Sequence, residues 1–154
     1  MRTTLMSLAL SLATGLFAAA AEADTAFPVH GNWCGPMHSG GPVHDPLDAA
    51  CRRHDICYGQ VRNLDCGCDL IFMDELRHLS WPSQAAYLKG RAVYEAIAVV
   101  PCFGTTQQQA TKLAWLRNDT AGAVARGREA RGAAFERVMR LIGTGLANAY
   151  MVEE

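Results

Sequence analysis

The sequence predicts an all-α fold in which disulfides hold short helices together. From Pro46 onward, apolar residues recur at helical spacing along most of the chain. No segment shows the alternation of apolar and polar residues that is typical of a strand. Six cysteines in 154 residues supply an even number of partners for cross-links. Together these observations predict a disulfide-linked antiparallel helical hairpin, with a loop before it and additional C-terminal helices after it.

The first residues have the organisation of a secretory signal. Arg2 gives a basic start, and an apolar run follows it up to the small-x-small motif Ala21-Glu22-Ala23. The run is too short and too rich in alanine to favour a membrane span. Cleavage just before this motif is an alternative. We therefore expect residues 1–23 to be a signal peptide, residues 24–154 to form a single domain, and the protein to be secreted, to a periplasm or outside the cell.

All six cysteines lie after the expected cleavage site, at positions 34, 51, 57, 66, 68 and 102. An even number of cysteines in a small exported chain indicates disulfides rather than free thiols. Six cysteines allow about 15 pairings, and their spacing alone does not choose among them. A zinc site is the alternative, because Cys66-Gly67-Cys68 and several histidines can coordinate a metal. The spacing lacks the Cys-x2-Cys pairs that are usual in zinc sites, which favours disulfides.

Residues 27–44 are predicted to be a loop that leads into the first helix. Gly, Pro, His and Asn dominate this segment, and it has no helical or alternating period. Asp45 then has the character of an N-cap, Pro46 suits the first helical position, and Asp48 places an acid in the first turn. We expect this helix to span residues 46–59.

Prolines and glycines divide the rest of the chain into further helices. Trp81-Pro82 ends the second predicted helix, Pro101 ends the third, and several glycines interrupt the alanine-rich remainder. The expected helices are residues 66–79, residues 83–100 and two more within residues 106–150.

The first helix carries ionisable groups where a helix normally carries apolar ones. At about 100° per residue, these groups fall within one stripe, which also begins with an apolar residue. Burying an isolated charge is unfavourable, so a helix that turns such groups inward usually pairs them or holds a metal. The stripe consists of Leu47, Cys51, His54, Asp55 and Tyr58.

The short connection of residues 59–65 forces the first two helices to run antiparallel. His54 and Tyr58 are then expected to face Asp69 of the second helix. A carboxylate beside an imidazole fixes its tautomer and leaves the other nitrogen free to act as a general base. Asp55 is expected to point towards the glycine-rich loop, whose carbonyl oxygens would complete the oxygen ligand set that calcium favours. Calcium beside a general base is suited to the attack of water on an ester.

At these residues the chain resembles the secreted phospholipase A2 superfamily. The resemblance covers residues 32–76, and the short span between His54 and Asp69 resembles the compact bacterial and viral members more than the animal ones. The matching motifs are Trp33-Cys34-Gly35-Pro36, Asp48-Ala49-Ala50-Cys51-Arg52-Arg53-His54-Asp55-Ile56-Cys57-Tyr58 and Cys66-Gly67-Cys68-Asp69.

The resemblance implies a phospholipase A2 that cleaves the sn-2 ester of glycerophospholipids. In that case, His54 activates the attacking water, Asp69 orients His54, and Tyr58 bonds to Asp69. The Gly35 amide helps to stabilise the oxyanion. The implied partner is a phospholipid membrane surface, and we expect a monomer. The implied calcium ligands are the carbonyls of Trp33, Gly35 and Met37 and the carboxylate of Asp55, and the implied disulfides are Cys34–Cys51, Cys57–Cys68 and Cys66–Cys102.

Met37 departs from the family pattern, which commonly has glycine at that position. Met37 is expected to offer its carbonyl only where the backbone does not require a positive φ. Otherwise the ligand is expected to shift towards Gly40 or Gly41.

Two alternatives stand beside the enzyme. The same disulfide fold can serve as a non-catalytic calcium- or lipid-binding module, although such a module is expected to lose His54 or Asp55. Residues 112–140 carry seven basic and three acidic side chains, which favours either an anionic bilayer or a solvated helix face. The formal net charge of −1 argues against a nucleic-acid partner.

Overall fold

A computed structural model describes residues 24–152, so the expected signal peptide lies outside the described residues. Five helices make up most of the described chain, which confirms the all-α class. The first two differ from their expected bounds by one residue at the C-terminal end, and the third differs by one residue at each end. None of the helices within the described part of the chain is both long and apolar enough to span a membrane. The helices are α1 (Pro46–Gln60), α2 (Cys66–His78), α3 (Gln84–Val99), α4 (Thr106–Ala125) and α5 (Ala133–Ala147).

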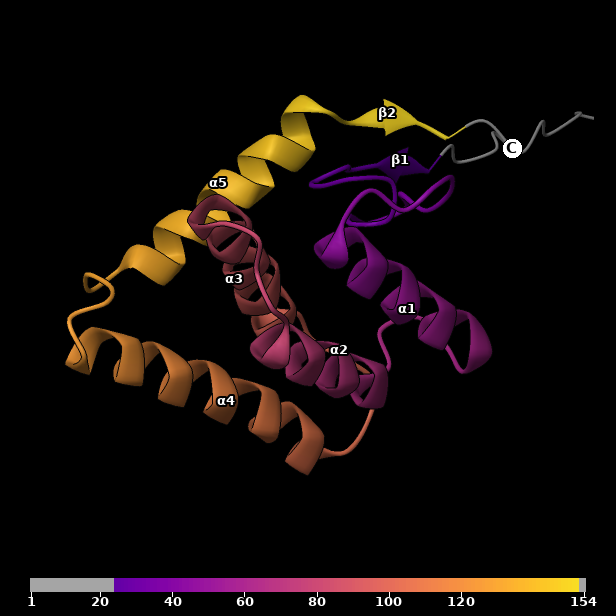
Figure 1. Cartoon of the computed structure of the whole chain (residues 1–154). Coiled ribbons are helices and arrows are strands. Elements are labelled where there is room, and N and C mark those ends of the chain that lie inside the picture. Colours follow the sequence, from indigo (N-terminus) through magenta and orange to yellow (C-terminus); the bar gives the residue numbers. More distant parts are fainter. Residues whose placement is uncertain (1–23, 153–154) are drawn as a thin grey trace, which may run out of the picture.

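A two-stranded antiparallel sheet joins the two ends of the described chain, and the sequence did not predict it. Strand β1 (Thr25–Ala26) pairs with β2 (Tyr150–Met151), which follows α5 (Figure 1). Two residues per strand are too few to produce a visible alternation of apolar and polar side chains.

Side-chain caps explain where the hairpin helices begin. The Asp45 carboxylate accepts the Asp48 N–H at 2.9 Å, and Pro46 occupies the first helical position. Asp65 caps α2 in the same way by accepting the N–H of Gly67 at 2.8 Å. Each cap satisfies a backbone donor that the helix itself leaves free. Because both caps are local, the sequence around them fixes the start of each helix.

Helices α1 and α2 pack against each other in antiparallel orientation. Near the end of α1, Cys57 is bonded to Cys68 at the start of α2. One turn earlier in α1, Arg53 Nε donates to Glu75 Oε1 at 3.1 Å, near the end of α2. This arrangement brings the middle of α1 against the first turn of α2.

All six cysteines form disulfides, in the pairing that the resemblance implies: Cys34–Cys51, Cys57–Cys68 and Cys66–Cys102. No cysteine thiolate is therefore left for the alternative zinc site. The Cys66–Cys102 bond ties the start of α2 to the segment that precedes α4.

A buried ionic cluster joins α5 to α3. Arg137 of α5 is 6% exposed, and its Nε donates to Glu95 of α3 at 3.0 Å. The same guanidinium donates to Glu129 at 2.7 Å. The apolar core lies between α1, α2 and α3, and it includes Leu47, Phe72, Met73, Leu76, Val93, Tyr94 and Leu141. Because Arg137 occupies the buried side of α5, much of the apolar surface of this helix is exposed to solvent.

Candidate active site

His54 lies in the middle of α1, where the hairpin contact buries it. Its side chain is 7% exposed, and its Nε2 lies 2.9 Å from Asp69 Oδ1. The imidazole stacks on the Phe72 ring, with 4.5 Å between the ring centroids and 14° between the ring planes. The hydrogen bond and the stacking contact together hold the imidazole in one orientation.

Asp69 receives three donors although it is fully buried. Its Oδ1 accepts from His54 and from the Tyr58 hydroxyl, and its Oδ2 accepts from the Lys112 ammonium. Burial by itself would raise the pKa of Asp69, but the hydrogen bonds from His54, Lys112 and Tyr58 outweigh it and lower the pKa. Asp69 is therefore a carboxylate at neutral pH.

Tyr58 stays a neutral phenol. Burial raises its pKa far above the ordinary value, and the hydrogen bond and negative charge of Asp69 add to the shift. A neutral phenol donates its hydrogen, so Tyr58 contributes a second donor to the same carboxylate oxygen that holds His54.

This arrangement leaves His54 with one nitrogen free. An ionised Asp69 accepts a hydrogen from Nε2, so the neutral imidazole carries its lone pair on Nδ1. Within residues 24–152, no side chain or backbone group makes a hydrogen bond to that nitrogen. His54 can therefore accept a proton from a molecule beside it, which is the property of a general base.

Asp48 holds the preceding loop against α1. Its side chain is fully buried, and its carboxylate accepts three backbone N–H groups. The donors are Asn32 at 3.0 Å, Trp33 at 2.8 Å and His44 at 3.0 Å. The sequence marks Asp48 as a first-turn acid and as the start of the matching helix motif, but it does not predict these loop partners, which lie up to 16 residues away.

Replacing Asp48 by alanine is expected to lower the free energy of unfolding by about 3–5 kcal/mol, because three buried N–H groups lose a charged acceptor. Urea unfolding followed by circular dichroism measures this change. Asp74→Ala is the matched control, since the Asp74 side chain is 54% exposed and makes only long contacts; it should change stability by less than about 0.5 kcal/mol. A loss below about 1 kcal/mol for Asp48→Ala would contradict the anchoring role.

Asp55 is a partly buried carboxylate that has no Lys or Arg partner among the described residues. The Ser39 hydroxyl of the loop donates to it, and none of the described Lys or Arg side chains forms an ion pair with it. Burial raises the pKa of Asp55, against the opposing effects of Ser39 and of the neighbouring histidines. Such a carboxylate fits a bound cation, since a positive charge would offset its desolvation.

The loop that contains Ser39 also offers backbone carbonyl oxygens as possible metal ligands. Within the described residues, the carbonyls of Trp33 and Met37 accept no hydrogen bond, whereas the Gly35 carbonyl accepts the His38 N–H at 3.2 Å. Carbonyl oxygens together with one carboxylate form the hard donor set that calcium prefers. The described residues contain no cluster of three or more His, Cys, Asp or Glu side chains that could hold a metal.

Gly35 occupies a position that only glycine fits. Its φ is +142°, and a Cβ built there would lie 2.1 Å from the Phe27 carbonyl oxygen. Its N–H donates to no acceptor within residues 24–152. The amide is therefore available to a ligand.

Met37 was expected to be a calcium ligand only where its backbone does not require a positive φ, and the structure does not meet this condition. Its φ is +55°, in the left-handed region that disfavours a side chain. Of the two alternative positions, Gly41 already accepts the Trp33 indole N–H through its carbonyl at 3.1 Å. Gly40 has a positive φ, and its carbonyl accepts no hydrogen bond from the described residues. Of the two glycines, Gly40 is thus the better candidate to supply the carbonyl that was expected from Met37.

Lys112 is the site residue that sequence reasoning missed. In the sequence it is one of the seven basic residues of the segment 112–140, a pattern that favours a solvated or membrane-facing surface. The structure instead buries it completely in α4, with its ammonium on Asp69. Arg137 is likewise buried and paired, so two of the seven basic residues do not contribute to the surface.

Comparison with known proteins gives a partial similarity. Two proteins of the centipede Scolopendra dehaani, both named phospholipase A2, are each 41% identical to this chain over 49 residues. Those residues are 32% of this chain and 33% of each relative, so the similarity spans about a third of the curated proteins. No family model and no solved structure matches the chain. Over about a third of its length, the chain is therefore similar to proteins named phospholipase A2.

Proposed function

We propose that this protein is a calcium-dependent phospholipase A2 that hydrolyses the sn-2 ester of glycerophospholipids. The observation that carries the proposal is the buried His54–Asp69 pair, with the free Nδ1 of His54 next to the carboxylate of Asp55, which pairs with no Lys or Arg among residues 24–152. The partial similarity to phospholipase A2 supports it. The three disulfides support secretion, since such bonds persist in oxidising compartments.

In the proposed reaction, His54 moves the proton. Nδ1 of His54 takes a proton from water as the water oxygen attacks the ester carbonyl carbon. The Gly35 N–H donates to the oxygen on which negative charge develops. When the tetrahedral intermediate collapses, the acyl C–O bond breaks and His54 returns the proton to the leaving alkoxide. Asp69 stays ionised throughout and holds the Nε2–H.

Calcium would be held by the Asp55 carboxylate and by the carbonyls of Trp33 and Gly35, with Met37 or Gly40 completing the set. When bound, the ion supplies positive charge that polarises the ester carbonyl and stabilises the oxyanion. The unbonded carbonyls of Trp33, Met37 and Gly40 and the raised pKa of Asp55 support this assignment.

A non-catalytic calcium- or lipid-binding module is the competing function. A pure binding module has no use for a buried imidazole whose tautomer is fixed by a carboxylate. The three donors gathered on Asp69 favour the enzyme.

The decisive experiment measures fatty acid released from phospholipid vesicles by the purified, oxidised protein. Release is expected with calcium and is expected to stop when EGTA is added. Substrates labelled in the sn-1 or the sn-2 chain identify the bond that is cleaved. Calcium binding without release of either chain would refute the enzyme and favour the binding module.

We further propose that a monomer meets the phospholipid surface through α5. The outward face of this helix carries four large apolar side chains at positions i, i+4, i+7 and i+11, which form one stripe along a helix. Their exposed fractions lie between 47% and 70%. The stripe consists of Phe135, Met139, Ile142 and Leu146.

The charges around this stripe favour an anionic bilayer as its partner. The exposed ionic residues of α5 and of the segment that leads into it are mostly arginines, and the one acid of α5 is Glu136. An amphipathic helix with basic flanks binds a bilayer by burying its apolar side while its charges meet anionic headgroups. The exposed arginines are Arg126, Arg128, Arg131 and Arg140.

Placing a charge in the stripe by Met139→Glu is expected to weaken binding to anionic vesicles by at least about tenfold, because a carboxylate resists transfer from water. Vesicle co-sedimentation measures the binding, and turnover of a monomeric short-chain substrate should stay unchanged. Leu113→Glu, at an apolar residue of α4 that is 46% exposed, is the matched control. Equal vesicle binding by both variants would contradict the assignment, and a dimer that dissociates in Met139→Glu would identify a second copy as the partner.

A further inference from the structure

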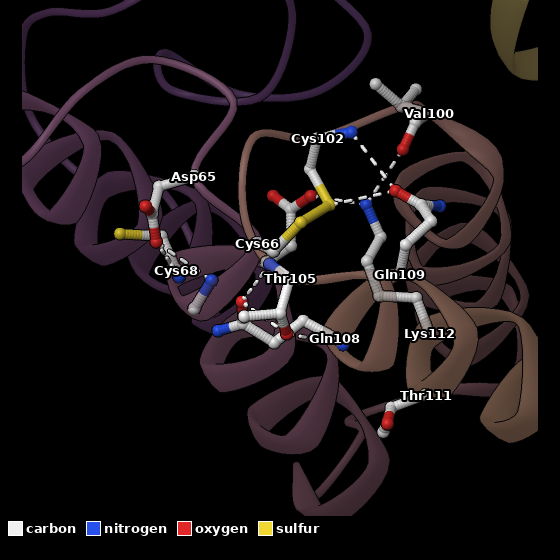
Figure 2. Close-up of a disulfide and its surroundings, with 12 residues drawn as sticks. Asp65, Cys66, Cys68, Val100, Cys102, Thr105, Gln108, Gln109, Thr111 and Lys112 are labelled. Carbon is white, nitrogen blue, oxygen red and sulfur yellow. Dashed lines mark hydrogen bonds and ion pairs between the residues drawn. A yellow bond between two sulfur atoms is a disulfide. The ribbon is translucent and has the colours of Figure 1, made fainter.

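The lysine on Asp69 is unusual because its charge is entirely buried. Lys112 lies near the middle of α4, and its Nζ donates to Asp69 Oδ2 and to the Val100 carbonyl at 2.8 Å. Figure 2 shows its ammonium directed towards Val100, next to the Cys66–Cys102 disulfide. It is one of two lysines in a chain whose other basic residues, histidines aside, are arginines.

Stability alone does not account for a lysine here. Removing two charges from water is unfavourable, and their attraction in the interior roughly offsets that cost. Apolar residues of similar volume generally serve a core equally well or better. The presence of an ammonium here is therefore better explained by its effect on Asp69.

Two effects on Asp69 follow from the geometry. The ammonium occupies Oδ2, so the carboxylate cannot rotate, and Oδ1 stays directed at His54 Nε2 and the Tyr58 hydroxyl. The positive charge also keeps Asp69 ionised. A protonated Asp69 could donate its own hydrogen to Nε2, and the imidazole would then carry its hydrogen on Nδ1, the nitrogen that must accept a proton.

The surroundings hold Lys112 in place. The Gln109 side chain, one turn before it in α4, accepts the Cys102 N–H at 3.2 Å. The Cys66 N–H in turn donates to the Phe103 carbonyl at 3.0 Å. These bonds and the Cys66–Cys102 disulfide fasten the start of α4 to the start of α2, three residues before Asp69.

We propose that Lys112 is a positioning residue of this site: from α4 it locks the Asp69 carboxylate in the orientation that gives His54 its reactive tautomer. The proposal rests on the proposed hydrolase function and deepens it. It makes α4 part of the catalytic apparatus, although the sequence motifs end in α2.

The test replaces Lys112 by methionine, which keeps the length of the side chain and removes its charge. We expect kcat on vesicles to fall by about 10–100-fold, the usual effect of losing such a supporting contact, with KM changed by less than about threefold. The ring ¹⁵N chemical shifts of His54, read at about pH 8, should show an Nε2–H tautomer in the wild type and a mixture in Lys112→Met. Lys89→Met, at the other lysine, should match the wild type in both measurements.

A second comparison keeps the proposal testable if Lys112→Met does not fold. In an Asp69→Asn background no carboxylate remains to be locked, so adding Lys112→Met should change kcat by less than about threefold. A larger effect there, or a wild-type tautomer and kcat in folded Lys112→Met, would overturn the proposal. The tautomer measurement needs no turnover, so a wild type that fails to hydrolyse vesicles would refute the proposed function without deciding the role of Lys112.

Discussion

His54→Gln is expected to reduce phospholipid turnover by about 10²–10⁴-fold, because glutamine cannot accept a proton from water. The amide of glutamine can still donate to Asp69, so the buried carboxylate keeps a partner and the fold survives. Calcium affinity should stay close to that of the wild type, since Asp55 and the loop carbonyls are unchanged. Fatty-acid release and calorimetric titration with calcium measure the two properties separately.

His78→Gln provides the matched control for this substitution. The His78 side chain lies on α2 and is 72% exposed, and its replacement should leave turnover unchanged. Substantial hydrolysis by the His54→Gln protein would refute the assignment of the base. Loss of calcium binding in the same protein would show that the substitution damages the loop as well as the base.

Asp55→Lys is expected to remove both calcium binding and turnover. The substitution eliminates the one carboxylate of the proposed ligand set and brings an ammonium to the position of the cation. We expect calcium affinity to fall by at least about 100-fold, because the attraction of a carboxylate is replaced by the repulsion of a like charge. His54 keeps its bond to Asp69, so the tautomer signal of His54 should persist while activity is lost.

The same charge reversal at Asp74 tests whether the effect is specific. Asp74 is an exposed residue of α2, and Asp74→Lys should leave calcium binding and turnover within about twofold of the wild type. Undiminished calcium binding by Asp55→Lys would place the ion elsewhere or show that the loop carbonyls suffice without the carboxylate.

Local signals predicted the hairpin and the pair at its centre. Asp45 and Pro46 fix the start of α1, and a connection of a few residues leaves α2 one way to pack against it. His54 and Asp69 are 15 residues apart, so their meeting follows from helical spacing and one turn. The sequence could predict this part of the site because each step depends on near neighbours.

Long-range contacts account for what the sequence did not predict. Lys112 meets Asp69 across 43 positions, and that contact depends on how α4 packs against α2. One signal was available: Lys112 falls on the same face of α4 as Leu116 and Ala123, which is the face that turns towards the core. A lysine among apolar residues on that face is a candidate for a buried pair.

The orientation of α5 could not be predicted for the same reason. Its pattern shows an apolar stripe, and such a stripe normally faces the core. Here Arg137 points inward because it pairs with Glu95 of α3, a residue 42 positions earlier in the chain. The left-handed backbone at Met37 is a further case, since a methionine gives no local sign of a positive φ.

Two disulfides hold the start of α2, just before Asp69, and their formation favours assembly of the proposed site. Cys57–Cys68 ties the carboxylate's helix to that of the imidazole, and Cys66–Cys102 ties it to the segment that leads to the buried lysine. A newly made chain whose sulfurs are still reduced lacks both ties, and the entropy of its open loops then works against assembly of the site. For the proposed hydrolase, this would protect the lipids of the cell that synthesises the chain, because base and acid are less readily brought together while the sulfurs are reduced.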